Sequence, residues 1–295
     1  MSHVAVLGAG AWGTALSLAQ AERGPVRLFT WDAAHAEAIA KERENRAFLR
    51  GFTLPEHVAV GADLERTLDG AELVILALPS LALRGVLERG RALFPKVPLV
   101  IASKGIEPGT WMLLTEVVAD VLGAEAAERA LVLSGPSFAL EVAKKLPTNV
   151  VVAAKSHALS VAVQGKLATE RLRVYSSDDP IGVQVGGALK NVIAIAAGAC
   201  DGLGFGHNTR AALITRGLAE ITRLAVRKGG NPMTLAGLAG MGDLVLTCTG
   251  DQSRNRTVGI GLGKGKKLTE VLAEMKQVAE GVKTTKSAHD LAARL

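Results

Sequence analysis

Over the first 178 residues, short apolar runs alternate with Ala- and Leu-rich stretches of helical length. The apolar runs have the length and character of buried strands. We expect strands at residues 4–7, 26–30, 72–78, 99–102, 131–133, 149–154 and 171–175, and helices at 11–21, 33–47, 81–93, 110–122, 138–144 and 158–169. Strands that alternate with helices in this way favour a mostly parallel sheet covered on both sides.

A glycine-rich turn follows the first expected strand and opens the first expected helix. Gly8, Gly10 and Gly13 match the pattern G-x-G-x-x-G. The first glycine of this pattern makes the bend, the second lets the backbone approach a pyrophosphate, and the third lets the helix pack on the strand. The N–H groups and dipole of the helix also favour a diphosphate. The motif in this context predicts a dinucleotide-binding site.

The pattern changes at a polar cluster that contains a proline, Ser176 to Pro180, which is typical of a linker and a helix start. Beyond it strand signals nearly vanish, and we expect helices at 181–199, 209–228, 234–238 and 268–280, joined by loops such as 201–206 and 261–267. We therefore predict an α/β fold in which a Rossmann-type doubly wound domain, 1–178, precedes an all-α domain, 179–295.

Composition excludes several classes of protein. Aromatic residues make up only 3 % of the chain, so a protein that stacks nucleic-acid bases is disfavoured. Cys200 and Cys248 form no C-x-x-C pair, and the histidines lack metal-binding spacing. We therefore expect neither a disulfide scaffold nor a metal site.

The net charge of +6 is unevenly distributed. Residues 1–178 carry 19 basic and 19 acidic side chains, whereas residues 179–295 carry 15 and 9. This excess predicts that the second part contacts an anion, with phosphate as the obvious candidate, and a solvated basic face is the alternative.

The N-terminus has no basic region followed by a small-residue cleavage site, so we expect a cytoplasmic protein. Residues 181–200 reach the length of about 20 residues that a membrane span needs. Gln184, Lys190 and Asn191 interrupt this stretch. A buried helix of a soluble protein fits it better than a membrane span.

The end of the second expected strand bears on the choice of coenzyme. Asp32 is the local candidate for the acidic residue that hydrogen-bonds a ribose 2′-hydroxyl. Trp31 either stacks on an adenine or packs as an ordinary core or surface tryptophan. Arg and His are absent from residues 28–32, so NAD is favoured over NADP.

Two isolated charges lie in apolar stretches. Lys190 is the only charged residue between 181 and 200, and burial of its ammonium would lower its pKa into the range useful for acid–base catalysis. Alternatively, its side chain reaches out to solvent. Asp243 is a single charge within 240–247, so we expect a charged partner, most naturally Lys190. A helix N-cap is the competing role for Asp243.

Further polar residues follow the expected strands. Lys104 follows the strand at 99–102, and the run from Ser134 to Ser137 follows the strand at 131–133. Ligands of open α/β sheets bind at the carboxyl ends of strands, so we expect both at the coenzyme crevice, although Ser137 could equally be an N-cap. We expect a polar loop at 251–256, which combines guanidinium, amide and hydroxyl groups, as a phosphate monoester requires.

Several long segments together resemble one known family. They are GAGAWGTAL at 8–16, SKG at 103–105, SGPSFA at 134–139, VYS at 174–176, GVQVGGALKNVIAIAAG at 182–198, DGLGFGHNTRAALITRGLAE at 201–220, GMGDLVLTCTG at 240–250 and QSRNR at 252–256. In these segments the chain resembles the bacterial NAD(P)-dependent glycerol-3-phosphate dehydrogenases. The resemblance implies a homodimeric enzyme that reversibly reduces dihydroxyacetone phosphate to sn-glycerol 3-phosphate for glycerophospholipid synthesis.

The resemblance also implies roles for individual residues. Lys190 would exchange the proton, with Asp243 and Lys104 balancing the charge. The implied substrate-binding residues are Lys104, Gly135, Ser137, Lys190, Asn191, Asp243, Ser253, Arg254 and Asn255. Together with the motif glycines Gly8, Gly10 and Gly13, the implied coenzyme-binding residues are Ala11, Trp12, Trp31, Lys104, Ala139, Arg254, Val278 and Glu280.

The chain departs from the family pattern at two points. Relatives often have Arg or His where Trp31 stands, so their preference for NADP does not transfer directly. The resemblance also leads us to expect a further C-terminal segment after Leu295.

Two other functions fit parts of the sequence. One is a dehydrogenase of the same architecture that acts on another hydroxy or keto acid, but the polar run 253–255 favours a phosphorylated substrate. The other is a dinucleotide sensor without turnover. Lys190 argues against a sensor, because a sensor gains nothing from the cost of a lysine in an apolar helix.

Overall fold

The computed structural model describes residues 2–275 and 279–294. It contains two compact units. Unit 1 consists of Met1–Ser103, Leu114–Leu133 and Ser137–Asp178, and unit 2 consists of Lys104–Leu113, Ser134–Pro136 and Asp179–Leu295. Two short segments from the first part of the sequence therefore belong to the second unit, and they carry Lys104 and Gly135.

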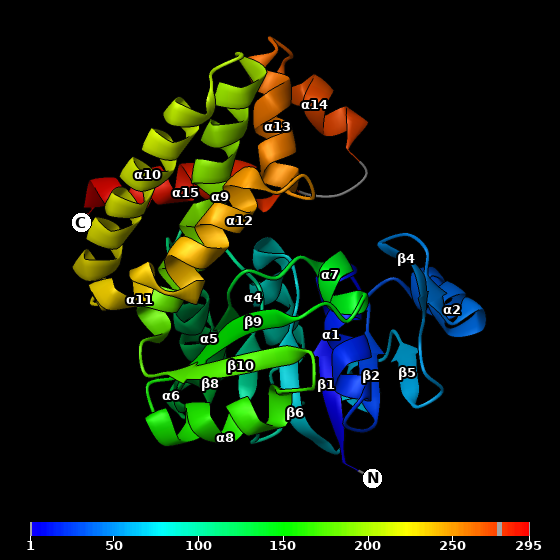
Figure 1. The fold of residues 1–295 in the computed structure, drawn as a ribbon. Helices are drawn as coiled ribbons and strands as arrows, with labels where there is room; N and C mark the ends of the chain where they lie inside the picture. The colour runs from blue at the N-terminus through cyan, green and yellow to red at the C-terminus, as the bar shows by residue number, and fades with distance from the viewer. Residues whose placement is uncertain (1, 276–278, 295) are drawn as a thin grey trace. The chain divides into compact units, whose positions relative to one another are not determined.

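Unit 1 is built on an eight-stranded sheet whose strands are flanked by helices (Figure 1). In spatial order the strands are β10 (Leu172–Ser177), β9 (Thr148–Ala153), β8 (Ala130–Ser134), β7 (Leu99–Ile101), β6 (Ala71–Leu76), β1 (His3–Leu7), β2 (Val26–Phe29) and β5 (Val58–Gly61). Leu7 pairs in parallel with Phe29 on one side and with Leu76 on the other. The strand order reverses at β1, which creates the switch point where open α/β sheets bind ligands. The expected mostly parallel α/β fold is confirmed.

Apart from α3 and α6, the helices of unit 1 agree with the sequence pattern, with differences at their ends. They are α1 (Ala11–Ala21), α2 (Ala33–Glu42), α3 (Leu64–Leu68), α4 (Ser80–Arg89), α5 (Leu114–Leu122), α6 (Ala124–Glu128), α7 (Ala139–Ala143) and α8 (His157–Leu167). The helix expected at 33–47 ends at Glu42, because Arg43 is left-handed with φ 54°. The helix expected at 110–122 begins only at Leu114, after a left-handed Trp111.

The sequence pattern missed β5, α3, α6 and one hairpin. The hairpin consists of β3 (Glu44–Asn45) and β4 (Leu49–Thr53), which pair antiparallel. It occupies the part of the sequence where the end of the second helix was expected. The run of Lys, Arg and Glu there has high helix propensity, and tertiary contacts override that propensity.

Unit 2 consists mainly of helices. They are α9 (Pro180–Gly202), α10 (His207–Arg227), α11 (Pro232–Ala236), the π-helical turn η1 (Leu238–Gly242), α12 (Asp243–Thr249), α13 (Arg254–Gly263), α14 (Leu268–Glu274) and α15 (Glu280–Arg294). Helix α9 begins where Asp179 caps it by accepting a hydrogen bond from the Gly182 N–H at 2.8 Å. It packs against α10, α12, α13 and α15.

Helix α9 is long and apolar enough to cross a membrane, but 67 % of its most apolar window is buried inside the structure. One such helix is weak evidence for a span. The packing of four helices around α9 is that of a core helix.

Two expectations for unit 2 were wrong. Residues 254–256 begin helix α13 rather than form a loop, and the helix expected at 268–280 ends at Glu274, where Met275 is extended. Residues 276–278 of that expected helix lie outside the described residues. Helix α12 was also missed.

Glycines bring α9 and α13 into backbone contact. A Cβ at Gly198 of α9 would lie 2.0 Å from the Arg256 carbonyl oxygen, and one at Gly259 of α13 would lie 1.9 Å from the Ile195 carbonyl oxygen. Both distances are far below van der Waals contact, so side chains at these positions would force the helices apart. The glycines that lower the helix propensity of α13 therefore allow its close approach to α9.

Substitution of Gly259 tests this packing. We expect Gly259→Ala to lower the free energy of unfolding by about 1–3 kcal/mol, because the new methyl group overpacks the helix contact. Denaturant unfolding measures the change. Gly165→Ala is the control, since a Cβ there on the exposed side of α8 meets nothing within 4 Å and should leave stability equal or slightly raised. A Gly259→Ala variant as stable as the control would refute the packing account.

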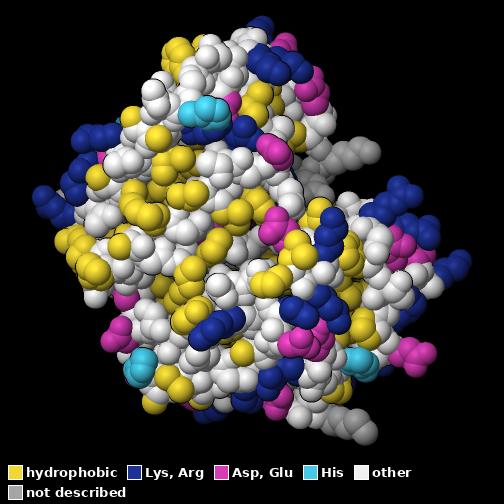
Figure 2. Space-filling model, viewed as in Figure 1, with side chains coloured by type: hydrophobic (Ala, Val, Ile, Leu, Met, Phe, Trp, Pro, Cys, Tyr) yellow, Lys and Arg dark blue, Asp and Glu magenta, His cyan; other side chains and the backbone are white. Residues whose placement is uncertain are grey.

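Charged side chains on the face shown in Figure 2 lie in several separate groups, with Lys and Arg interspersed with Asp and Glu. The basic side chains visible on this face are thus spread out rather than gathered in one patch.

Candidate active site

The glycine turn of unit 1 has the geometry that its sequence predicts. Gly8 has φ 116°, and a Cβ there would lie 2.4 Å from the Ala77 carbonyl oxygen at the end of β6. A Cβ at Gly13 would lie 1.9 Å from the Gly8 carbonyl oxygen, so helix and turn touch through backbone alone. Gly10 precedes the first residue of α1, and a Cβ there would meet nothing within 4 Å. The turn therefore leaves open space beside Gly10 at the start of a helix, which fits a pyrophosphate.

Asn45 supports this turn, and sequence reasoning missed it. Its side chain is fully buried, and its Nδ2 donates to the Ala9 carbonyl oxygen at 2.9 Å and to Oγ1 of Thr14 at 2.8 Å. Its Oδ1 faces Nε2 of His35 at 3.1 Å. Nothing in the sequence marks Asn45, because it lies 36 positions from Ala9 in a polar run that resembles a surface helix.

Other predicted coenzyme residues of unit 1 lie near the ends of its elements. Trp31 follows β2 and is 71 % exposed, which excludes a core role. Asp32 caps α2 by accepting from the His35 N–H at 3.1 Å. Ala139 is the first residue of α7, and Ala11 is the first residue of α1. The buried Nε1–H of Trp12 finds no hydrogen-bond partner among the described residues, and it is a donor that a bound coenzyme could use.

Unit 2 assembles the three residues predicted for catalysis. Nζ of Lys190, from the middle of α9, donates to Oδ1 of Asp243 at the start of α12. Nζ of Lys104 donates to Oδ2 of Asp243 at 2.6 Å and to the Gly135 carbonyl oxygen at 3.3 Å. Ser134 adds a longer contact from its Oγ to Asp243 Oδ2 at 3.4 Å. The expected pairing of Lys190 with Asp243 is confirmed.

Burial and mutual contact shift the pKa values of this cluster. Lys190 is 7 % exposed and Asp243 is 1 % exposed, so the solvent-reaching alternative for Lys190 is wrong. Burial, reinforced by the nearby charge of Lys104 and opposed by Asp243, lowers the pKa of Lys190 to about 7. Burial alone would raise the pKa of Asp243, but the two ammonium groups outweigh it and hold that pKa below its usual range. The cluster thus contains a carboxylate that stays charged and an amine that can gain or lose a proton near neutrality.

The N-cap alternatives for two residues are also wrong. Asp243 is the first residue of α12 rather than its cap, and its carboxylate binds the lysines. Phe138 precedes α7 as its cap, so Ser137 lies one position before it.

The remaining substrate residues predicted for unit 2 lie mostly around the start of α13. Ser253 caps α13 by accepting from the Arg256 N–H at 3.3 Å, and Arg254 is the first residue of the helix, with an exposed side chain. Asn255 is buried, its Nδ2 donates to Oδ1 of Asn191 at 2.9 Å, and its Oδ1 accepts from the Gly281 N–H at 2.9 Å. Asn191 follows Lys190 on α9. This chain of amides links α9 to the first turn of α13.

Of the other predicted residues, Glu280 begins α15 in unit 2. Ser137 belongs to unit 1, with the glycine turn, Trp31 and Ala139. Val278 lies outside the described residues.

Comparisons with known proteins cover nearly the whole chain. Residues 3–160 match the family model described as the NAD-dependent glycerol-3-phosphate dehydrogenase N-terminus, and residues 179–295 match the model of the C-terminus. A glycerol-3-phosphate dehydrogenase [NAD(P)+] of Myxococcus xanthus is 55 % identical over 288 residues, which are 97 % of this chain and 86 % of the relative. One of Geobacter sulfurreducens is 53 % identical over 294 residues, 99 % of this chain and 88 % of the relative.

The fold agrees with a solved structure as well. The crystal structure of a glycerol-3-phosphate dehydrogenase from Coxiella burnetii matches with a TM-score of 0.94 and 42 % identity, over 99 % of this chain and 89 % of that chain.

A dinucleotide turn at the switch point of a parallel sheet and a buried, charge-balanced lysine define an oxidoreductase of the coenzyme-dependent dehydrogenase class. The family models and the sequence identities place the chain in one family of this class. The chain belongs to the NAD(P)-dependent glycerol-3-phosphate dehydrogenase family.

Proposed function

We propose that this chain reduces dihydroxyacetone phosphate to sn-glycerol 3-phosphate, and catalyses the reverse oxidation, with Lys190 as the general acid and base. The observation that carries the proposal is the buried cluster of Lys190, Asp243 and Lys104 in a chain of this family. A nicotinamide coenzyme, when bound, supplies the hydride. Residues 1–178 carry the glycine turn and most of the proposed coenzyme residues, and residues 179–295 carry most of the proposed substrate residues.

Lys190 transfers the proton, with Lys104 and Asp243 beside it. Reduction of a ketone places negative charge on its oxygen, and the Lys190 ammonium donates a proton to that oxygen. The Lys104 ammonium is held beside the same carboxylate, so it stabilises developing negative charge, while Asp243 supplies one negative charge that both lysines share. In the reverse direction the neutral Lys190 amine accepts the proton of the alcohol.

The first turn of α13 is the proposed site for the substrate phosphate. Arg254 contributes an exposed guanidinium at the N-terminus of a ten-residue helix, and Ser253 lies at its cap. Guanidinium groups and helix N-termini both favour phosphate oxygens. Asn255 and Asn191 complete the proposed subsite from the buried side.

Arg254→Ala tests the phosphate subsite. We expect it to raise the KM for dihydroxyacetone phosphate by about tenfold or more, which corresponds to loss of one charge-assisted hydrogen bond. The KM for unphosphorylated dihydroxyacetone should change little, because that ketone has no phosphate to bind. Steady-state kinetics with the two ketones measures both values. Equal effects on both ketones would disconnect Arg254 from the phosphate.

NAD is the proposed preferred coenzyme, with NADP also accepted. Residues 28–32 offer no cation for a 2′-phosphate, and the carboxylate of Asp32 would repel one while accepting a bond from a ribose hydroxyl. The exposed indole of Trp31 is available to stack on the adenine. Trp12, Ala139, Arg254, Val278 and Glu280 are further proposed coenzyme residues on the family resemblance.

Trp31→Arg tests the coenzyme proposal. We expect the ratio of kcat/KM for NADPH to that for NADH to rise by about tenfold, because the new guanidinium supplies the missing partner of the 2′-phosphate. Trp31→Phe is the control that removes the indole without adding charge. An unchanged ratio in Trp31→Arg would mean that this strand end does not read the 2′ position.

On the same family resemblance we propose that the chain acts as a cytoplasmic homodimer that supplies glycerophospholipid synthesis. Sedimentation of the purified protein at several concentrations tests the homodimer.

A further inference from the structure

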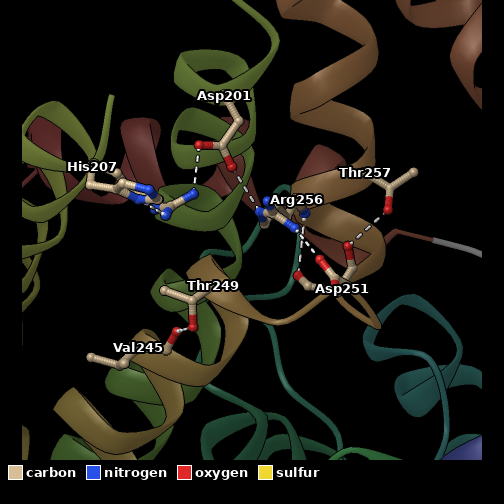
Figure 3. Close-up of polar contacts among 9 residues, drawn as sticks. Asp201, His207, Val245, Thr249, Asp251, Arg256 and Thr257 are labelled. Atoms are coloured by element: carbon tan, nitrogen blue, oxygen red, sulfur yellow. Dashed lines mark hydrogen bonds and ion pairs between the residues drawn. The ribbon is translucent and has the colours of Figure 1, made fainter. Parts of the chain in front are cut away.

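Arg256 lies two positions after Arg254, but its side chain is bound within an ion-pair cluster (Figure 3). Its Nε donates to Oδ2 of Asp201 at 2.8 Å, and its Nη1 donates to Oδ1 of Asp251 at 2.9 Å. Asp201 lies in the last turn of α9, and its Oδ1 accepts from Nη1 of Arg210 on α10 at 2.8 Å. The cluster of Asp201, Arg210, Asp251 and Arg256 thus joins the end of α9 to the starts of α10 and α13.

The core of this cluster is shielded from water. The side chains of Asp201, Arg210 and Arg256 are only 14 %, 20 % and 15 % exposed. Ion pairs with little solvent contact are screened weakly, and a guanidinium that binds two carboxylates holds a defined orientation. In addition, Nδ1 of His207 lies 2.6 Å from Nη2 of Arg210. The cluster is therefore suited to fixing the position of the α13 backbone.

The first turn of α13 is also held from its other side. Asn255 binds Asn191 of α9 and the Gly281 N–H of α15. Arg254 stands between the two fixed residues Asn255 and Ser253, and its side chain is exposed. The side chains of its two neighbours, Ser253 and Asn255, both form hydrogen bonds that hold the turn.

We propose that the cluster of Asp201, Arg210, Asp251 and Arg256 is a positioning device for the substrate phosphate. Arg256 does not touch the substrate. It holds the turn that presents Ser253 and Arg254, so the cluster determines the affinity for the phosphate group and leaves the proton transfer at Lys190 unaffected. The proposal rests on the assignment of the phosphate to Arg254 under the proposed function. The sequence QSRNR carries two arginines, and the structure assigns them different tasks.

The test compares Arg256→Met with Arg216→Met. Arg216 forms an exposed ion pair with Glu220 on the surface of α10, which makes it a matched control. We expect Arg256→Met to raise the KM for dihydroxyacetone phosphate and the inhibition constant of inorganic phosphate by about ten- to a hundredfold, since small displacements of binding groups have effects of this size. The KM for unphosphorylated dihydroxyacetone and kcat should stay close to those of the control. Arg256→Lys, which retains the charge, should recover part of the affinity.

Asp251→Asn keeps the test valid if Arg256→Met fails to fold. Asp251 is 98 % exposed, so its substitution removes the negative charge from one contact of Arg256 without opening the core. We expect the same change of KM in the same direction, but smaller.

Two results would overturn the proposal. One is an unchanged KM for dihydroxyacetone phosphate in folded Arg256→Met and Asp251→Asn. The other is an equal rise for the phosphorylated and unphosphorylated ketones, which a merely structural role would give. Arg254→Ala in the same assay separates the two claims. If Arg254→Ala raises the KM selectively for the phosphorylated ketone and the Arg256 variants do not, only the positioning proposal fails. If Arg254→Ala raises the KM equally for both ketones, the phosphate assignment itself fails.

Discussion

Lys190→Ala is expected to lower turnover by about 10²–10⁴-fold, the usual contribution of a positioned general acid or base. The Lys190 ammonium is buried beside Asp243, and the variant has no group there to protonate the ketone oxygen. The Kd for NADH should be nearly unchanged, because the glycine turn proposed to bind the coenzyme belongs to unit 1. Steady-state kinetics and NADH titration measure the two effects separately.

The control for this variant is Lys266→Ala. Lys266 forms a surface ion pair with Glu274, and its loss should leave turnover unchanged. The pH profile adds a signature of the lysine, whose pKa is lowered to about 7. Ketone reduction needs the ammonium and should slow as pH rises through about 7, whereas alcohol oxidation needs the free amine and should quicken over the same range. Wild-type turnover in Lys190→Ala would remove this residue from the mechanism.

Asp243→Asn is expected to lower the free energy of unfolding by about 3 kcal/mol, because it leaves buried ammonium groups without a counter-charge. The carboxylate binds both Lys104 and Lys190 and is almost fully buried. Denaturant unfolding at neutral pH measures the loss. The double variant Asp243→Asn with Lys190→Met should lose less than the sum of the two single losses, since it removes a charge along with its partner.

The pH dependence of stability gives a second readout for Asp243. Its pKa is lowered in the folded chain, so the unfolded chain binds its proton first as pH falls. Its contribution to stability is therefore complete above about pH 4, the ordinary carboxyl pKa, and is lost as pH falls through the lowered value. Asp243→Asn should lack this part of the acid dependence. A variant as stable as the wild type, with the same acid dependence, would contradict the role assigned to the cluster.

The parts of the fold that follow local pattern were predictable from the sequence. Strands such as 4–7 and 99–102 are short, apolar and bounded by turns. The glycine turn is predicted by the spacing of its three glycines. Lys190 and Asp243 could be paired in advance because each is a lone charge in an apolar stretch, and a buried charge needs a partner.

The parts that depend on contacts between distant segments were not predictable. Asn45 supports the glycine turn from a hairpin that lies in a sequence of helical character. Residues 254–256 were expected in a loop because the run 251–256 is densely polar, but they begin helix α13, which packs closely on α9 through Gly259. Asp201 accepts hydrogen bonds from Arg210 and Arg256, and no local sequence pattern indicates that these residues meet.

The most direct test of the proposed activity is oxidation of NADH and NADPH by the purified chain, followed by their absorbance. Dihydroxyacetone phosphate is the substrate, and pyruvate, ketopantoate and unphosphorylated dihydroxyacetone are the controls. We expect rapid oxidation with the phosphate ester alone, faster with NADH than with NADPH. Measurable NADH binding without oxidation by any of the four compounds, or equal rates with ketopantoate, would contradict it.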